Sequence, residues 1–197
     1  MPSMDEIYEA HADRYDELVS AEDYQGNLPR FLLSLAEWQG ARVLEAGTGT
    51  GRVTRIYAEH AAEIYCCDRS EHMLSRAETN LAQFLPKIKF FKADNLAFPR
   101  FRNPVDIFIE GWSFGHVILE KGEVEDTTRK LLKNVEMNLL PGGMIILIET
   151  LGTAAPTPEV PHPLLGDFYE ELQEKYGFRG QILRTDYQFD TPDQASE

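Results

Sequence analysis

Three acidic residues that follow apolar runs are the strongest candidates for binding chemistry in this chain: Glu45, Asp68 and Asp94. Glu45 stands two positions before the first of three glycines, at 47, 49 and 51. A glycine-rich turn at a strand end lets the backbone approach a ligand closely, and a carboxylate about twenty residues further on can accept hydrogen bonds from ribose hydroxyls. The pattern predicts a cofactor site at the carboxyl edge of an open sheet.

The spacing of the glycines indicates which class of cofactor fits. A dinucleotide loop follows G-x-G-x-x-G, but this chain has Arg52 where the last glycine would stand, and its third glycine is Gly51. The G-x-G-x-G form led by Glu45 resembles motif I of the class I S-adenosylmethionine-dependent methyltransferases, of the small-molecule, type 11-like kind. A carboxylate suits the ammonium and sulfonium of that cofactor and would tend to repel a pyrophosphate.

Two more motifs are similar to those of the same family: D-x-S-x-x-M-L at 68–74 and L-L-P-G-G at 139–143. The resemblance implies that Asp68 binds the ribose, that Met73 lies beside the adenine, and that Asp94 with its neighbour binds the adenine amino group. Periodicity alone fits a core methionine equally well, and the Asp-Asn pair also fits a plain turn. The implied cofactor-binding residues are Tyr15, Glu45, Gly47, Thr48, Gly49, Gly51, Asp68, Arg69, Met73, Asp94, Asn95, Leu96, Gly111 and Trp112.

The segment 110–116 follows the fourth predicted strand and is expected to form the floor of an active site. Its glycines permit close backbone approach, and Trp112 and Phe114 are expected to pack against a flat acceptor or to shield the sulfonium from water. His116 is a candidate general base, although a structural histidine is the slightly more frequent role.

The mechanism that the resemblance implies is an in-line attack of a small-molecule acceptor on the methyl group, with S-adenosylhomocysteine as the product. Alignment and exclusion of water would supply most of the catalysis. An acceptor that must lose a proton requires a base, and the candidates are His116, Glu149 and His162. Glu110 and Glu149 form only a partial carboxylate set, so no metal is predicted.

The elements that must position these residues alternate along the chain. Short apolar runs predict strands at 43–46, 64–67, 88–93, 105–109 and 144–148, and amphipathic patterns predict helices after Ser70 and at 123–138. This order predicts an α/β fold with a Rossmann-like doubly wound sheet, mostly parallel and covered by helices on both faces. We expect one domain over 1–197, with a helical cap at 1–40, a cofactor-binding core at 41–150 and an acceptor-side part at 151–197.

Both ends of the chain carry further expectations. Tyr8, His11 and Tyr15 resemble the cap of small-molecule methyltransferases and are expected to close over the cofactor, although aromatics that pack a helix onto the sheet fit equally well. A helix that opens at Leu28 should turn Leu35 inward.

A proline-rich loop at 153–163, a helix at 164–176 and a sixth strand at 181–189 should follow the core. The tail 190–197 is too short for the seventh strand of the family. Either the chain is a piece of a longer protein or another subunit covers the edge. An exposed edge strand predicts a homodimer or a destabilised carboxyl terminus.

Composition limits the classes of partner and the cellular location that we expect. The 197 residues are 43% hydrophobic, enough for one substantial core, and the formal net charge of −14 disfavours a nucleic acid partner. Residues 1–20 are largely polar and acidic, with no long apolar segment, so we expect a cytoplasmic protein without membrane contact. Two adjacent cysteines in a buried strand are expected to be reduced.

Two other function classes are compatible with parts of the sequence. A non-catalytic S-adenosylmethionine-binding or regulatory protein would share the cofactor residues but lack room for an acceptor beside the methyl group. A nicotinamide-dependent oxidoreductase would share the sheet and Asp68, but Glu45 and Arg52 disfavour it.

Overall fold

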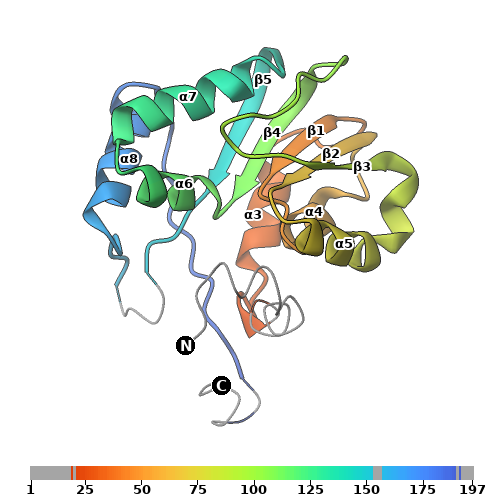
Figure 1. The fold of residues 1–197 in the computed structure, drawn as a ribbon. Coiled ribbons are helices and arrows are strands. Elements are labelled where there is room, and N and C mark those ends of the chain that lie inside the picture. Colours follow the sequence, from red (N-terminus) through yellow and green to blue (C-terminus); the bar gives the residue numbers. More distant parts are fainter. Residues whose placement is uncertain (1–18, 20, 153–156, 190, 192–197) are drawn as a thin grey trace.

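Five parallel strands form one sheet in the order β3-β2-β1-β4-β5 in the computed structural model, which describes residues 19, 21–152, 157–189 and 191 (Figure 1). From β1 the chain adds β2 and β3 on one side of the sheet and then β4 and β5 on the other side. The carboxyl end of β1 is therefore the switch point, where an open sheet binds ligands. The strands are β1 (Arg42–Ala46), β2 (Glu63–Asp68), β3 (Ile88–Lys92), β4 (Val105–Gly111) and β5 (Leu139–Ile148).

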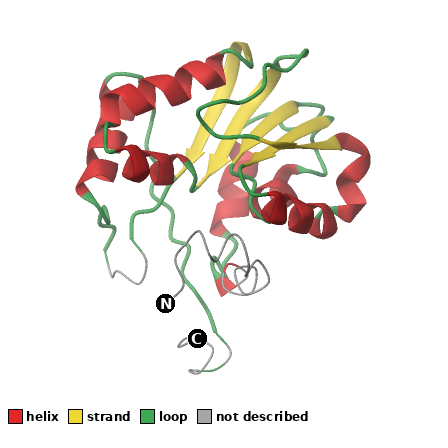
Figure 2. Cartoon of the chain, viewed as in Figure 1, coloured by secondary structure: helices red, strands yellow, loops and turns green. Residues whose placement is uncertain are grey.

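Helices cover both faces of the sheet, as predicted for a doubly wound fold (Figure 2). Side chains alternate along β1, so Val43 joins the core under α3, α4 and α5, while Leu44 joins the core under α6, α7 and α8. The helices are α3 (Asn27–Leu35), α4 (Arg52–Tyr57), α5 (Glu71–Asn80), the 3-10 helix η1 (Ala82–Lys87), α6 (Phe114–Lys121), α7 (Val124–Glu136) and α8 (Pro163–Glu174).

The helix after β2 begins where the sequence predicts. The Ser70 side chain accepts a hydrogen bond from the backbone N–H of Met73 and caps α5. Met73, Leu74 and Ala77 form its buried face. The cap fixes the point at which the chain leaves β2, directly after Asp68.

β5 begins earlier than predicted. The sequence predicts that the L-L-P-G-G segment is a turn before a strand at 144–148, but the strand starts at Leu139. The strand is irregular at the L-L-P-G-G segment. Gly142 has a φ of 81°, and the pairing with β4 shifts register between Val105 and Ile107.

The predicted sixth strand at 181–189 is wrong. Figure 2 draws this segment as a loop, and its only ladder contact among the described residues is an isolated antiparallel bridge between Glu22 and Tyr187. Its backbone instead binds the segment before α3, through Tyr24 N to Asp186 O and Gln188 N to Ala21 O. β5 therefore forms the sheet edge beside β4, and the expected homodimer through an edge strand stays a prediction.

Two details of the amino-terminal part also bear on the predictions. Leu35 is 37% exposed rather than turned inward, because α3 buries Leu28 and Leu32 instead. Tyr8, His11 and Tyr15 lie outside the described residues, so the lid stays a prediction. No helix in the described ranges combines the length and apolarity needed to cross a membrane.

Candidate functional site

The glycine-rich loop after β1 has the conformation that its sequence requires. Gly47, Gly49 and Gly51 have φ angles of 62°, 54° and 89°, which favour glycine. Contacts add a second requirement, because a Cβ on Gly47 would lie 2.2 Å from the Cβ of Ser113. A Cβ on Gly51 would lie 2.7 Å from the side chain of Leu81. The loop therefore touches both the end of α5 and the segment after β4.

Asp68 fastens this loop to the end of β2. One carboxylate oxygen accepts a hydrogen bond from Gly49 N at 2.8 Å, and the other accepts one from Ser70 N at 2.8 Å. Burial raises the pKa of Asp68, and the N–H donors of Ser70 and Gly49 oppose that shift. The structure thus brings Asp68 and the glycine-rich loop together, as the sequence predicts.

Glu45 lies beneath the loop, 1% exposed, on the face of β1 covered by α4. Its Oε2 accepts hydrogen bonds from the hydroxyls of Thr54, at 2.8 Å, and Tyr57. Burial raises the pKa of Glu45 to about 7. The sequence predicts a carboxylate that faces the cofactor, whereas this carboxyl group has partners on α4. The sequence pattern that could have indicated these partners is the pair Thr54 and Tyr57, three positions apart on the inward face of α4.

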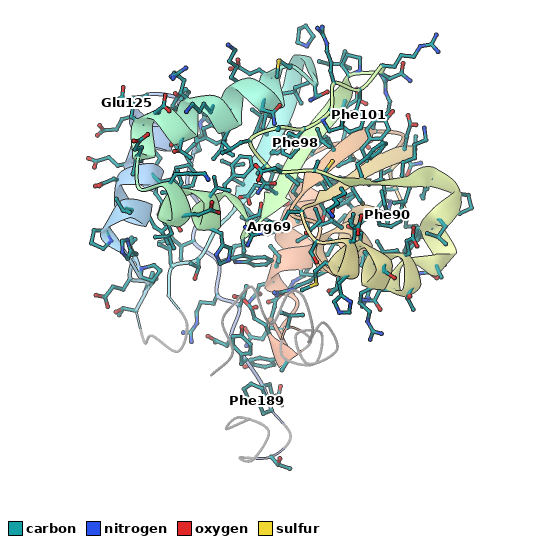
Figure 3. All side chains as sticks on the ribbon, viewed as in Figure 1. Arg69, Phe90, Phe98, Phe101, Glu125 and Phe189 are labelled. Atoms are coloured by element: carbon teal, nitrogen blue, oxygen red, sulfur yellow. The ribbon has the colours of Figure 1, made fainter. Side chains whose placement is uncertain are left out.

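Arg69 and Met73 follow β2, and Asp94, Asn95 and Leu96 follow β3. These two strands are neighbours in the sheet. Asp94 is exposed, and its Oδ1 accepts a hydrogen bond from Leu96 N at 2.7 Å, while the carbonyl of Asn95 accepts one from Asn134. Arg69 lies between the two groups of helices and pairs with Glu120 at 3.5 Å (Figure 3). Met73 is 1% exposed.

The segment after β4 turns sharply toward the glycine-rich loop. Trp112 has a φ of 54°, a strained value for a bulky residue, and its N–H donates to the carbonyl of Ile148 at 2.7 Å. The guanidinium of Arg52 lies over its indole ring at 4.5 Å. A Cβ on Gly111 would lie 2.9 Å from Val53. The turn is therefore packed from below by α4.

One aromatic prediction for this turn is wrong. Phe114 does not face an acceptor, because it begins α6 and is fully buried, with its ring 5.8 Å from that of Phe108. The residues 114–116 belong to a helix rather than to an open loop.

The three candidate bases lie on different elements. His116 is exposed in the first turn of α6. His162 caps α8, where its Nδ1 accepts a hydrogen bond from Leu164 N at 3.2 Å. Glu149 follows β5, and its Oε1 accepts a hydrogen bond from Gly115 N at 2.6 Å. Glu149 therefore contacts the segment that follows β4 directly.

The loop also offers a polar group without a protein partner. Thr48 is 4% exposed, and its hydroxyl has no hydrogen-bond partner within the described part of the chain. Three backbone N–H groups of the same loop are already used: Thr48 N by the carbonyl of Cys67, Gly49 N by Asp68 and Gly51 N by the carbonyl of Thr48.

Comparison with known proteins decides the family. Residues 43–143, just over half of the chain, match the model of a methyltransferase domain. The chain belongs to this family.

The similar proteins include named methyltransferases and solved structures of S-adenosylmethionine-dependent methyltransferases. An uncharacterized methyltransferase of Geobacillus sp. (strain WCH70) is 32% identical over 64% of this chain and 61% of its own length. Phosphoethanolamine N-methyltransferase 3 of Arabidopsis thaliana is 30% identical over 62% of this chain and 24% of its own length. A crystal structure of an S-adenosylmethionine-dependent methyltransferase from Mesorhizobium loti is 28% identical over 66% of this chain and 57% of that one, with a TM-score of 0.51.

This methyltransferase domain spans about three fifths of the Geobacillus relative. The matched region contains β1 to β4 and the start of β5, and with them Glu45, Asp68, Asp94 and the turn after β4. It excludes Glu149, α8 and the segment 181–189, so the expected acceptor side lies outside the matched region.

Sequence reasoning missed one residue of this chain that joins three segments. Glu22, before α3, accepts hydrogen bonds from Arg52 at 2.8 Å, Thr185 at 2.7 Å and Tyr187 at 3.2 Å. It therefore ties the carboxyl-terminal segment to the residue that follows the glycine-rich loop. No sequence signal marks it, because its partners are 30 to 165 positions away.

Within the described residues, no group of three or more His, Cys, Asp or Glu side chains could hold a metal ion. A hollow of about 450 Å³ opens at the amino-terminal edge of the sheet, opposite the glycine-rich loop. Arg42, Glu63 and Lys89 line it. It is remote from the cofactor-binding candidates, which lie at the carboxyl ends of the strands.

Proposed function

We propose that this chain transfers the methyl group of S-adenosylmethionine to a small-molecule acceptor. The observation that carries the proposal is the junction of three segments at the carboxyl end of β1. Asp68 holds Gly49, and Gly47 lies against Ser113 of the turn after β4. A cofactor bound by the first two segments would present its reactive end to the third.

Each cofactor residue has a proposed role. The backbone of residues 47–51, including Thr48, would hold the methionine end, and Glu45 would lie beneath the loop on that side. Asp68 and Arg69 would lie at the ribose, and Met73 beside the ribose and adenine. Asp94, Asn95 and Leu96 would bind the adenine edge, and Gly111 and Trp112 would lie next to the reactive end.

The bound cofactor supplies an activated methyl group on a sulfonium. The chain's own contribution would be to orient the acceptor and exclude water, and the Arg52–Trp112 stack beside the turn suits that role. An acceptor that releases a proton requires a base at that end. The candidates are His116 and His162, which are exposed, and Glu149, whose Oε1 already accepts a hydrogen bond from Gly115 N.

A small acceptor fits the charge of the chain better than a nucleic acid. The formal net charge is −14, and phosphate backbones bind through clustered Lys and Arg side chains. The N-methyltransferase activity named for the Arabidopsis relative is consistent with a small-molecule acceptor. The proposal extends to the class of acceptor and not to the atom that receives the methyl group.

The test has two steps. Thermal unfolding with S-adenosylmethionine, S-adenosylhomocysteine or NAD should show stabilisation by the first two compounds only, because a ligand stabilises the state that binds it. A screen of metabolite pools with a methyl-labelled cofactor should then transfer label to a small compound. Stabilisation without any labelled product would favour a non-catalytic binding protein, and no stabilisation would reject the proposal.

A further inference from the structure

Glu110, at the end of β4, is fully buried beneath the turn that it precedes. Its Oε2 accepts three hydrogen bonds: from Ser113 N at 2.9 Å, from the Ser113 hydroxyl at 2.9 Å and from Phe114 N at 3.1 Å. These backbone donors are at the start of α6, where N–H groups have no partner inside the helix. Glu110 therefore fixes the position of Ser113, the residue that lies against Gly47.

Glu149 approaches the same turn from β5. Its Oε1 accepts a hydrogen bond from Gly115 N at 2.6 Å, and a Cβ on Gly115 would lie 2.7 Å from its Oε2. Glycine at 115 thus leaves room for a carboxyl group. The two acids hold consecutive parts of one turn, Glu110 at 113–114 and Glu149 at 115.

The two carboxyl groups lie at consecutive N–H groups of one turn. Phe114 N donates to Glu110 Oε2 and Gly115 N donates to Glu149 Oε1, while Glu110 Oε1 is buried and has no hydrogen-bond donor among the described residues. Two adjacent carboxylates repel each other, whereas one acid and one carboxylate form a hydrogen bond. A proton on Glu149 would give Glu110 Oε1 a donor.

The surroundings favour retention of that proton. Burial raises the pKa of Glu110 to about 7, and burial together with the charge of Glu110 raises the pKa of Glu149 well above its usual range. The other titratable group that faces the pair is Tyr169 of α8, whose hydroxyl donates to the carbonyl of Thr150. The first turn of α6 also carries His116, which is exposed.

We propose that Glu110 and Glu149 share one proton and act together as positioning residues, holding the turn 111–115 against the glycine-rich loop. This inference rests on the proposed function, because the loop is the proposed site of the cofactor. Loss of the shared proton would leave two adjacent charges and push the turn away from Gly47. Cofactor binding should then depend on the protonation of the pair.

The test measures the affinity for S-adenosylhomocysteine by calorimetry at pH 6 and pH 9 in the full chain. The wild type should bind roughly tenfold more weakly at pH 9. E149Q should lose less affinity between pH 6 and pH 9 than the wild type does, since an amide can donate to Glu110 at either pH. E110A should weaken binding at both pH values because the N–H groups of α6 lose their acceptor, and E110Q should restore most of the affinity at pH 6.

E171Q is the matched control. Glu171 is also buried, at 8% exposed, but it lies on α8 and pairs with Lys175. It should keep the pH profile of the wild type. Contributions from Glu45, Asp68 and the amino group of the ligand are common to all variants and cancel in the comparison.

Thermal unfolding over the same pH range separates the two proposals. E149Q should flatten the fall of the melting temperature between pH 6 and pH 9, whether or not a ligand is present. A wild-type pH dependence in E149Q, in both binding and unfolding, would overturn the pair. A wild type that binds no S-adenosylhomocysteine at any pH would instead overturn the proposed function.

Discussion

Single residues in this protein are constrained by neighbours far away in the sequence. Gly47 is needed both for its φ of 62° and for the space that Ser113 occupies. The first reason is local and the second is tertiary. The two can be separated, because Gly40 has a φ of 77° and nothing within 4 Å of a Cβ.

Gly47→Ala should therefore cost more than Gly40→Ala. Both changes strain a left-handed residue, by about 1 kcal/mol or more. Only Gly47→Ala also drives the turn after β4 away from the loop, so we expect about 2 kcal/mol of additional destabilisation and loss of measurable S-adenosylhomocysteine binding. Urea unfolding and calorimetry measure the two effects. Equal destabilisation by the two substitutions would show that the Ser113 contact carries little energy.

Asp68 offers a second prediction at this scale. Asp68→Ala removes the acceptor of both Gly49 N and Ser70 N, so the glycine-rich loop loses its tie to β2. We expect affinity for S-adenosylhomocysteine to fall at least about tenfold, or about 1.4 kcal/mol. Asp106→Ala is the control, because its carboxylate accepts from Arg42 N at the other end of the sheet. That variant should bind as the wild type does.

At the scale of elements, the segment 181–189 is attached to the amino-terminal side of the site instead of extending the sheet. Figure 1 shows it leaving α8 and running toward α3. The attachment depends on Glu22, which is 13% exposed and joins Arg52 to Thr185 and Tyr187. Arg52 in turn lies over Trp112. The carboxyl-terminal segment is thus linked through two contacts to the turn after β4.

Glu22→Ala should loosen this segment. The side chains of Arg52, Thr185 and Tyr187 would each lose an acceptor, so we expect a loss of about 1–2 kcal/mol and faster amide exchange at Gln188, whose N–H donates to Ala21. Asp186→Ala is the control, since its pair with Arg184 is exposed and worth little. Unchanged exchange at Gln188 in Glu22→Ala would contradict the attachment through Glu22.

For the whole molecule, burial of acids makes stability depend on pH. The pKa of Glu45 is raised to about 7 in the folded state, above its unfolded value. The folded state therefore holds the proton more tightly, and the free energy of unfolding should fall as pH rises from about 4.5 to 7. Glu45 accounts for about 3 kcal/mol of this fall at most, and Glu110 acts in the same direction.

Glu45→Gln should reduce this pH dependence, because the amide keeps an acceptor for Thr54 and Tyr57 but does not titrate. Urea unfolding at pH 5 and pH 8 measures it. Glu63→Gln on the neighbouring strand is the control, since Lys89 lowers the pKa of Glu63 below this range. A slope in Glu45→Gln as steep as in the wild type would mean that Glu45 is not protonated in the folded state.

The sequence by itself determined the class of the fold and the alternation of its five strands with helices along the chain. Strand and helix periodicities, the G-x-G-x-G loop and the Ser70 cap are local patterns, and local backbone chemistry is sufficient to place them. The position of Asp68 beside the glycine-rich loop could be predicted because parallel strands bring their carboxyl ends to one edge of the sheet. The expectation for 181–189 failed because alternation of apolar residues does not say which backbone partner is available.

Only the tertiary structure decided the surroundings of each acid. It placed Glu45 beneath the loop with Thr54 and Tyr57, and it brought Glu110 and Glu149 under one turn. It also recruited Glu22 from outside the motifs. The physical reason is that a carboxyl group's pKa and partners depend on burial and on neighbours from other elements, which the spacing of residues along the chain does not specify.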